Sequence, residues 1–288
     1  EMHELAKHHC VRIIHLSDLH FGTVPPYLVE PLLLRISELQ PRVVVVSGDL
    51  TQRARDAQFA DAAAFLKRIP FAQVVVPGNH DVPLYNVIAR FADPLGNYRR
   101  HLGEDVEPSY EDDELVVIGV NTARSFTWKD GRISIEQMER LKSRLSMVPE
   151  SVYKVVVMHH PIIPLTQGMN IPAVGRSRKA RKILESVRTD IILAGHGHHR
   201  CACPTERKPA TVGHAILVIQ AGTTLSDRTR GTANNFNVLD MERDAVTLTP
   251  FEWSAESNGF VASPSTLFHG RGSWIPDASE NPGPGIDR

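Results

Sequence analysis

Five short segments of this chain contain the side chains that most readily bind metal ions. Each segment lies at the end of an apolar run that resembles a β-strand, and each offers carboxylate, imidazole or amide donors. Nitrogen and oxygen donors without thiolate favour Mn, Fe or Zn at a reactive site over a closed structural zinc. The segments are Asp18-Leu19-His20, Gly48-Asp49, Gly78-Asn79-His80-Asp81, His159-His160-Pro161 and Gly195-His196-Gly197-His198.

The spacing of these donors indicates how they could act together. Residues two apart in an extended chain point the same way, so Asp18 and His20 can bind one ion, as can His196 and His198. Segments far apart in sequence meet only if the fold brings their strand ends together. Because open α/β sheets bind ligands at the carboxyl ends of their strands, we expect all five segments to converge on one edge.

Strand-like and helix-like patterns alternate along the chain, which indicates stacked βα units. Several expected strands are too uniformly apolar to be half-exposed, so they should be buried on both faces. The last strands lack long helices between them, which predicts a second sheet made of hairpins and packed against the first. The expected strands are 11–16, 43–47, 74–76, 116–120, 155–158, 191–194, 215–220, 236–239 and 245–248, and the expected helices, each with one apolar stripe, are 28–39, 59–69, 135–148 and 180–187.

The pattern D-x-H, G-D, G-N-H-D, H and G-H-x-H resembles the calcineurin-like metallophosphoesterase superfamily over residues 10–250. The resemblance implies an α/β fold, namely a four-layer α/β/β/α sandwich with two mixed β-sheets and a dinuclear metal site at the strand ends. We expect residues 10–252 to form this domain. Residues 253–288 are rich in Gly, Pro and Ser, which predicts an irregular C-terminal extension.

The resemblance also assigns two divalent ions, expected to be Mn, Fe or Zn. Such a pair lowers the pKa of a shared water and clamps the attacking and leaving oxygens of a displacement at phosphorus. His159 is preferred to His160 as a ligand because it is the first residue after its strand. The expected ligands are Asp18, His20, Asp49 and His198 for one ion, and Asn79, His159, His196 and the bridging Asp49 for the other.

By the same resemblance, His80 lies just outside the metals. There it would stabilise the transition state or protonate the leaving alkoxide, which suits an imidazole with a pKa near neutrality. Many relatives place an acidic group at the position of Gln52 to orient this histidine, so what orients His80 here stays open, although the Gln52 amide could accept its N–H. Asp81 is expected to be structural and to hold the turn.

Three further residues are candidates for contact with substrate. Arg228 and Arg230 belong to a long polar loop that follows a strand close to the ligand-bearing loops. Guanidinium groups can bind phosphate with two parallel hydrogen bonds, and loops of this kind usually select substrates. His160, next to the expected ligand His159, either supports that ligand or faces the substrate.

Departures from the superfamily pattern narrow the expected activity. Asp81, where serine/threonine protein phosphatases carry Glu, argues against those enzymes, and Gln52 replaces the Tyr ligand of purple acid phosphatases. The remaining resemblance is to bacterial class III cyclic-nucleotide phosphodiesterases, which implies metal-bridged hydroxide attack on a small phosphodiester such as a cyclic nucleotide. A UDP-diacylglucosamine-type pyrophosphatase or a nuclease is the alternative. A non-catalytic scaffold is disfavoured because every motif residue is kept.

Composition excludes several other classes of protein. The 288 residues, 42% hydrophobic and 23% charged, suit one globular domain with a large core. A net charge of −1 gives no basic field for nucleic acid or an anionic membrane. No apolar run approaches the roughly 20 residues needed to cross a bilayer. Three cysteines, an odd number, fit a reducing compartment. We expect a cytoplasmic protein with a small phosphoester substrate, and a homodimer is compatible with the sequence.

Overall fold

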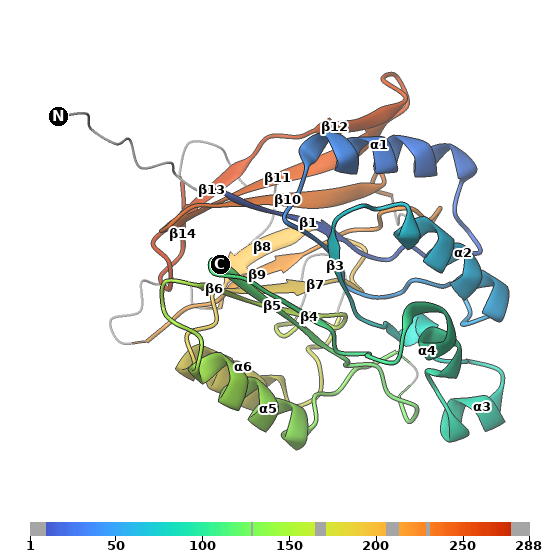
Figure 1. Cartoon of the computed structure of the whole chain (residues 1–288), viewed down its shortest axis with the longest axis horizontal. Helices are drawn as coiled ribbons and strands as arrows, with labels where there is room; N and C mark the ends of the chain where they lie inside the picture. Colours follow the sequence, from blue (N-terminus) through green and yellow to red (C-terminus); the bar gives the residue numbers. More distant parts are fainter. Residues whose placement is uncertain (1–9, 128, 165–170, 206–212, 229–230, 278–288) are drawn as a thin grey trace.

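The structure is a computed structural model that describes residues 10–127, 129–164, 171–205, 213–228 and 231–277. Two β-sheets pack face to face, and helices cover the outer face of each sheet (Figure 1). Each sheet contains both parallel and antiparallel pairs of strands. The four-layer α/β/β/α sandwich with two mixed sheets, expected from the sequence, is therefore confirmed.

The first sheet has eight strands, and three of them form its parallel part. These are β1 (Val11–Leu16), β2 (Val43–Val46) and β3 (Ala72–Val75), whereas β10 (Asn235–Met241), β11 (Ala245–Ser254), β12 (Gly259–Ala262), β13 (Thr266–His269) and β14 (Ile275–Pro276) extend the sheet with antiparallel pairs. The strand order is β14-β13-β11-β10-β1-β2-β3, and β12 pairs with β11. β10 pairs with β1 so that Leu239 lies opposite Ile13.

The second sheet has six strands in the order β4-β5-β6-β7-β9-β8. Its four central strands, β5, β6, β7 and β9, are parallel to one another, and an antiparallel strand closes each edge. The strands are β4 (Ser109–Glu111), β5 (Leu115–Val120), β6 (Tyr153–Met158), β7 (Ile191–Ala194), β8 (Cys201–Pro204) and β9 (Leu217–Gln220).

The helices occupy the two outer layers. Among the longer ones, α1 and α2 pack on the first sheet, and α5 and α6 pack on the second. In the part of the chain that the structure describes, no helix is long and apolar enough to cross a membrane. The helices are η1 (Pro26–Leu28), α1 (Val29–Leu39), α2 (Asp56–Lys67), η2 (Asn79–Asp81), α3 (Val87–Ala92), α4 (Gly96–Leu102), α5 (Ile135–Ser146) and α6 (Ser177–Ser186).

The central strands are apolar on both faces because both faces are covered. In β2, Val44 and Val46 pack against the helical layer, whereas Val43 and Val45 pack between the sheets. A strand buried on both sides has no solvent face that requires polar residues. The prediction of fully buried strands from their uniform apolarity is confirmed.

The four predicted long helices are also present. The third of them, α5, begins at a capping box. Ser134 accepts from the backbone N–H of Gln137 at 3.1 Å, and the Gln137 side chain accepts from the Ser134 N–H at 2.7 Å. This start matters for the fold because α5 covers the second sheet through Met138 and Leu141.

The prediction of a second sheet made of hairpins from the last strands is wrong. β9 joins the second sheet in parallel with β7, whereas β10 and β11 join the first sheet through β1. The hairpin formed by β10 and β11 has apolar side chains on both faces. Val238 packs against the outer helices and Leu239 packs between the sheets, so this hairpin requires a sheet that is covered on both faces. Apolar periodicity identifies a strand but not its pairing partner.

The predicted irregular C-terminal extension is also wrong for its described part. β11 runs through the proposed boundary at residue 252 to Ser254, and β12, β13 and β14 follow. β12 pairs with β11 through register pairs such as Trp253 opposite Phe260, and β13 continues the sheet. Phe260 and Phe268 are buried in the core, which provides the apolar contact that stabilises these short strands.

Candidate metal centre

The candidate ligands lie at the edge where the parallel strands of both sheets end. Asp18 and His20 follow β1, Asp49 follows β2, and the other segments follow β3, β6 and β7. Within the first sheet, the Asp18 N–H donates to the Gly48 carbonyl at 3.1 Å. Between the sheets, the His196 N–H donates to Asp18 Oδ2 at 3.2 Å. The predicted convergence of the segments on one edge is confirmed.

The backbone at this edge adopts a conformation that non-glycine residues seldom adopt. Ten non-glycine residues of the described ranges have positive φ, and five of these are candidate ligands. Holding such a residue there costs about 1–2 kcal/mol. This concentration of strain indicates that the turns at the strand ends serve to place their side chains. The five are Asp18, His20, Asp49, His196 and His198, with φ between 49° and 72°.

One group of donor atoms forms around His20 Nε2. This nitrogen lies 3.6 Å from Asp18 Oδ1 and 3.7 Å from Asp49 Oδ2. His198 Nε2 lies 3.7 Å from the same Asp18 Oδ1. Atoms bound about 2.1 Å from one ion stand roughly 3.0–3.5 Å apart, so a small contraction would let these four residues bind one cation.

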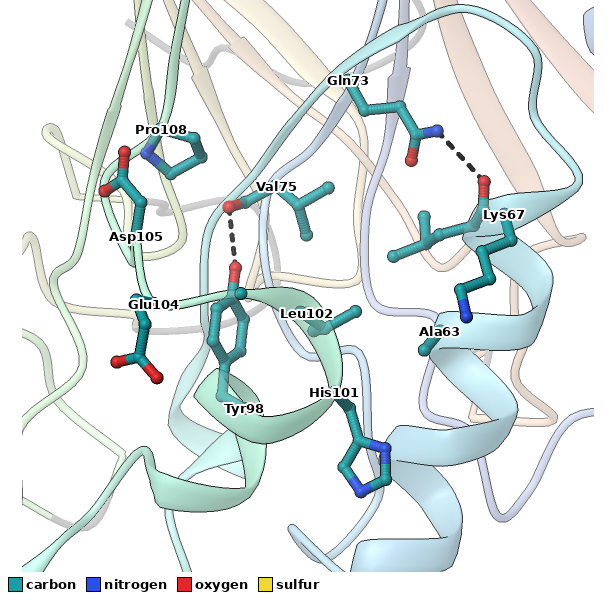
Figure 2. A pocket seen from close by; sticks show the side chains of 12 residues that line it. Ala63, Lys67, Gln73, Val75, Tyr98, His101, Leu102, Glu104, Asp105 and Pro108 are labelled. Carbon is teal, nitrogen blue, oxygen red and sulfur yellow. Dashed lines mark hydrogen bonds between the residues drawn. The ribbon is translucent and has the colours of Figure 1, made fainter.

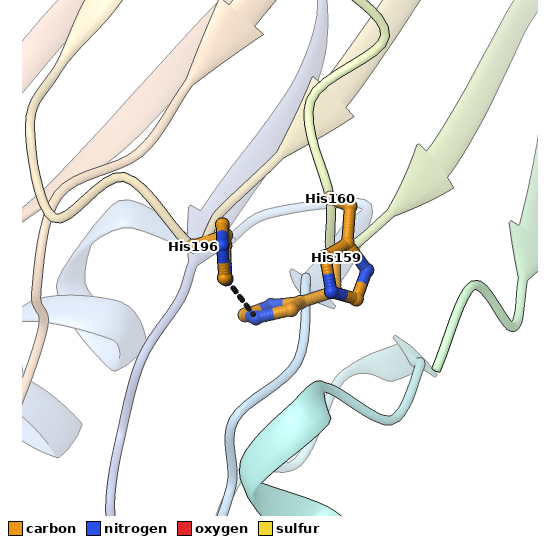
Figure 3. Close-up of side chains that lie close together, drawn as sticks. All are labelled: His159, His160 and His196. Carbon is orange, nitrogen blue, oxygen red and sulfur yellow. Dashed lines mark hydrogen bonds between the residues drawn. The ribbon is translucent and has the colours of Figure 1, made fainter. Parts of the chain in front are cut away.

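A second group of donor atoms forms around Asn79 Oδ1. It lies 3.1 Å from His159 Nε2 and 3.0 Å from His196 Nδ1. The two ring nitrogens are 3.3 Å apart, and Figure 3 shows their rings together with that of His160. His159 Nε2 is 3.4 Å from Asp49 Oδ1. Asp49 thus presents one carboxylate oxygen to each group, as a ligand shared by two ions would.

Unpaired polar atoms inside the first group show that a cation would fit there. Among the described residues, Asp18 Oδ1 and both ring nitrogens of His20 are buried without a hydrogen-bond partner. Leaving a buried polar atom unpaired costs about 1–3 kcal/mol. The other Asp18 oxygen accepts from the Ser17 hydroxyl at 2.6 Å, so Oδ1 is the one available to an ion. The donor set suits a divalent ion that binds nitrogen and oxygen.

Hydrogen bonds behind two of the rings determine which nitrogen faces the site. His159 Nδ1 donates to the Ser47 carbonyl at 2.8 Å, so Nε2 is the ring nitrogen that faces the site. His198 Nδ1 lies 2.7 Å from the Thr223 hydroxyl, which likewise leaves Nε2 for an ion. Such partners orient a metal ligand and strengthen it. Thr223 was not predicted from the sequence, although its position shortly after β9, at the same edge, is a signal that indicates such a role.

The buried carboxylates give the site a negative potential. Burial alone would lower the pKa of His159, but neighbouring Asp49 raises it to about 9. Burial alone would raise the pKa of Asp49, but His159 and His80 hold it well below its ordinary range. In the metal-free protein, a proton on His159 therefore balances the carboxylate charge. A bound cation would replace that proton.

The turn after β3 is built to approach Asp49 closely. A Cβ atom at Gly78 would collide with the Asp49 carboxylate, so only glycine fits there. The His80 N–H donates to Asp49 Oδ1 at 2.9 Å. Asp81 accepts from the N–H groups of Gly78 at 2.8 Å and Thr51 at 2.9 Å. The expectation that Asp81 holds the turn is confirmed.

His80 is oriented by the main chain of Gln52 and not by its side chain. His80 Nδ1 donates to the Gln52 carbonyl oxygen at 2.9 Å. Gln52 Oε1 instead accepts from Arg228 Nη1 at 3.3 Å, and the same Nη1 lies 3.4 Å from His80 Nε2. The expectation that the Gln52 amide accepts the His80 N–H is therefore wrong. Because the acceptor is a carbonyl, no acidic residue is needed at position 52.

The structure separates the three expected substrate contacts. Arg228 lies beside His80, as described above, whereas Arg230 lies outside the described residues. His160 is buried, its Nε2 donates to the Lys129 carbonyl at 3.0 Å, and its Nδ1 lies 2.7 Å from the Thr122 hydroxyl. Both ring nitrogens are used within the protein, so the expectation that His160 contacts substrate is wrong. The residue supports the loop that carries Lys129.

A hollow of about 450 Å³ lies away from these donor groups (Figure 2). Residues of α2, β3, α4 and the loop after α4 line it, and the Tyr98 hydroxyl donates to the Val75 carbonyl at 2.8 Å. No candidate ligand is among the described residues that line this hollow. The metal-binding chemistry and the hollow are therefore separate features.

The fold and the two donor groups define a class of metal-dependent phosphoester hydrolases. The family model of the calcineurin-like phosphoesterases matches residues 11–200, a range that includes all five candidate segments. The chain belongs to this family, whose members depend on a dinuclear metal centre, and it is a hydrolase. The resemblance inferred from the sequence is confirmed.

Two curated relatives have similar sequences. The chain is 24% identical over 196 residues to a probable cyclic nucleotide phosphodiesterase of Vesicomyosocius okutanii. This match spans 65% of this chain and 78% of the relative. The chain is 29% identical over 163 residues to a 3′,5′-cyclic adenosine monophosphate phosphodiesterase of Haemophilus influenzae. That match spans 54% of this chain and 54% of the relative, so the chain matches about half of the latter protein.

Solved structures share the fold at low sequence identity. A purple acid phosphatase from yellow lupin seeds superposes with a TM-score of 0.66 at 15% identity, covering 90% of this chain and 53% of that longer chain. A dimetal phosphatase from Danio rerio superposes with a TM-score of 0.63 at 12% identity, covering 88% of this chain and 98% of that one. These likenesses concern the fold alone.

Proposed function

We propose that this chain hydrolyses small phosphodiesters, such as cyclic nucleotides, with two divalent ions. The proposal is carried by the two donor groups that share Asp49, with His80 and Arg228 beside them. Two such ions lower the pKa of a water and neutralise charge on the phosphate oxygens. The residues proposed to hold them are Asp18, His20, Asp49 and His198 for one ion, and Asn79, His159, His196 and the shared Asp49 for the other.

His80 and Arg228 are proposed to contact the phosphate group. Arg228 can only donate, so its contact with His80 Nε2 requires that nitrogen to be unprotonated. Burial lowers the pKa of His80 below its ordinary value and the charge of Arg228 acts in the same direction, whereas Asp49 and the hydrogen bond to the Gln52 carbonyl offset only part of this. Once His80 is protonated, two donors face each other, and a phosphate oxygen between them would accept from both. The bound anion would thus favour the ring form that can protonate a leaving alkoxide.

The named activities of the two curated relatives support cyclic nucleotides as the first substrates to test. Fold and metal centre alone do not select the substituents on the phosphate.

The three free cysteines, Cys10, Cys201 and Cys203, support our further proposal that the protein acts in the cytoplasm.

Diesters are expected to be hydrolysed faster than monoesters by more than about tenfold, or about 1.4 kcal/mol in activation free energy. A monoester dianion adds a second negative charge beside Asp18 and Asp49, which are buried and held in their charged forms. The measurement compares bis-p-nitrophenyl phosphate with p-nitrophenyl phosphate on protein supplied with Mn²⁺. A higher rate on the monoester would refute the proposed diesterase activity.

The same panel distinguishes the alternative activities. It should include cyclic AMP and UDP-diacylglucosamine, because hydrolysis of the second without the first would favour a pyrophosphatase. A single-stranded oligonucleotide tests for a nuclease. A protein that binds no metal and turns over none of these substrates would instead be a scaffold. Metal analysis of the same sample shows which ions it holds, since the donor set alone leaves Mn, Fe and Zn open.

Arg228→Gln is expected to raise the KM for a diester by roughly 10- to 100-fold, the usual worth of a hydrogen bond to a charged group. The matched control is Arg55→Gln, which removes the same charge from an exposed side chain of the neighbouring loop. Gln52→Ala should give a smaller rise in KM because Gln52 Oε1 only holds Arg228 in place. Equal effects of Arg228→Gln and Arg55→Gln would indicate a general effect of charge and contradict the proposed contact.

A further inference from the structure

Five large apolar side chains gather on two neighbouring segments, α3 with its preceding loop and the loop after β5. We call them the apolar platform: Tyr85, Val87, Ile88, Phe91 and Phe126. They are between 52% and 87% exposed, and they are five of the eleven exposed large apolar side chains among the described residues. Phe91 and Phe126 meet edge to face with ring centroids 5.3 Å apart, which joins the two segments. Exposed apolar clusters of this kind usually mark a binding surface.

A buried arginine beneath the platform holds its two segments together. Arg90 donates to the carbonyls of Pro83 at 2.9 Å, Ser125 at 2.7 Å and Thr127 at 2.8 Å. Its side chain thus bridges the loop before α3 and the loop after β5. These three hydrogen bonds from one buried cation fix the two segments relative to each other. The apolar side chains on these segments are therefore preorganised for binding.

The platform is connected to the candidate metal centre on two sides. On one side, Arg53 stacks over the Tyr85 ring at 5.9 Å, and the residue before Arg53 is Gln52, whose carbonyl orients His80. On the other side, Lys129 is three residues after Phe126 in the sequence, and its carbonyl accepts from His160. A group attached to a phosphate at the metal centre could therefore extend onto the platform.

We propose that the apolar platform binds an alkyl or acyl chain of a phosphodiester substrate. The inference rests on the proposed phosphodiesterase activity and narrows the substrates to diesters with an apolar substituent. A second copy of this chain is the competing occupant, and the oligomeric state tests it. The continuity with the metal centre favours the substrate itself.

The test is a series of alkyl p-nitrophenyl phosphates in which only the alkyl group changes from methyl to butyl to octyl. Water attack gives p-nitrophenol and the alkyl phosphate in every case, so the chemistry is constant. Each fully buried methylene is worth about fourfold, so kcat/KM should rise roughly tenfold or more from butyl to octyl on a partly covering surface. Concentrations stay below the critical micelle concentration of the octyl ester.

The double variant Ile88→Ser, Phe126→Ser should reduce the ratio of octyl to methyl kcat/KM toward one. The matched control is Met147→Ser, which removes a side chain that is 75% exposed at the C-terminal end of α5 and should keep the wild-type ratio. A wild-type ratio near one, with clear turnover of the methyl ester, would overturn the platform proposal and leave the proposed function standing. Absence of turnover by the metal-loaded protein would overturn both.

Two further measurements identify a different occupant. If sedimentation equilibrium shows a wild-type dimer and a monomeric double variant, a second copy covers the platform and the substrate proposal is wrong. If the wild type, but not the double variant, co-sediments with phosphatidylcholine vesicles and the octyl-to-methyl ratio is one, the platform binds a lipid surface, and the proposal is equally wrong. A monomer that leaves such vesicles unbound and selects the octyl ester supports the proposal.

Discussion

Asp49→Ala is expected to lower the affinity for both metal ions together, each by more than roughly 100-fold. Substituting a residue that only supports a metal ligand lowers the affinity by up to about that factor, and Asp49 is itself a proposed ligand. Asp49 Oδ2 faces His20 at 3.7 Å, and Asp49 Oδ1 faces His159 at 3.4 Å, so one substitution removes a donor from both groups. It also removes the carboxylate that raises the pKa of His159, which leaves less negative charge to attract a cation. The measurement is metal content per chain after dialysis.

The matched control for Asp49→Ala is Asp240→Ala. That substitution removes a carboxylate that pairs with Arg12 at 2.6 Å near the start of β1, at the opposite end of the strand from Asp18. It should leave the metal content unchanged even if it lowers stability. A variant Asp49→Ala that retains either ion at full occupancy would show that this carboxylate does not bridge the two sites.

His80→Ala is expected to slow the hydrolysis of cyclic AMP by roughly 10²–10⁴-fold while metal content stays unchanged. The leaving group of cyclic AMP is an alkoxide that needs a proton, whereas p-nitrophenolate leaves without one. The loss on bis-p-nitrophenyl phosphate should therefore be smaller. Equal losses on both substrates would indicate that His80 stabilises charge instead of donating a proton. His101→Ala is the control, because His101 lies at the separate hollow and pairs with Asp56.

The pH dependence gives an independent check on His80. A general acid works in its protonated form, so the rate on cyclic AMP should fall as pH rises through the pKa of His80. Burial and the charge of Arg228 lower that pKa more than Asp49 and the Gln52 carbonyl raise it, so in the free enzyme the fall in kcat/KM should begin below the ordinary histidine value of about 6.5. Metal ions bound at the proposed centre would lower the pKa of His80 further. The fall should be absent in His80→Ala.

Much of the site was predictable because its residues lie at strand ends. Donor residues directly after parallel strands must meet at one edge, whatever the details of packing. The spacing of Asp18 and His20 correctly predicted that both side chains lie in one donor group. The same expectation for His196 and His198 is wrong, because both residues have positive φ and their side chains lie in different donor groups. The strand-end reasoning preferred His159 to His160, and the structure places His159 Nε2 in the second donor group while both nitrogens of His160 are bonded elsewhere.

The contacts that depend on main-chain atoms could not be predicted. The Gln52 carbonyl that orients His80 is a group that every residue possesses, so the side chain at position 52 contains no information about it. The Gln52 amide turned out to contact Arg228, 176 residues away along the chain, and only the packed loops decide that approach. The apolar platform likewise depends on Arg90, which donates to three main-chain carbonyls. Because every residue has a carbonyl, these contacts could not be predicted from the amino-acid types.

The sequence by itself determined the class of fold, the buried strands and the candidate metal ligands, because apolar periodicity and donor spacing are local properties of the chain. Only the tertiary structure decided that β10 and β11 extend the first sheet, and that β12, β13 and β14 continue it where an irregular extension was expected. A strand can pair with any exposed edge that buries its apolar faces, so its partner is chosen by the assembled core and not by the strand's own residues.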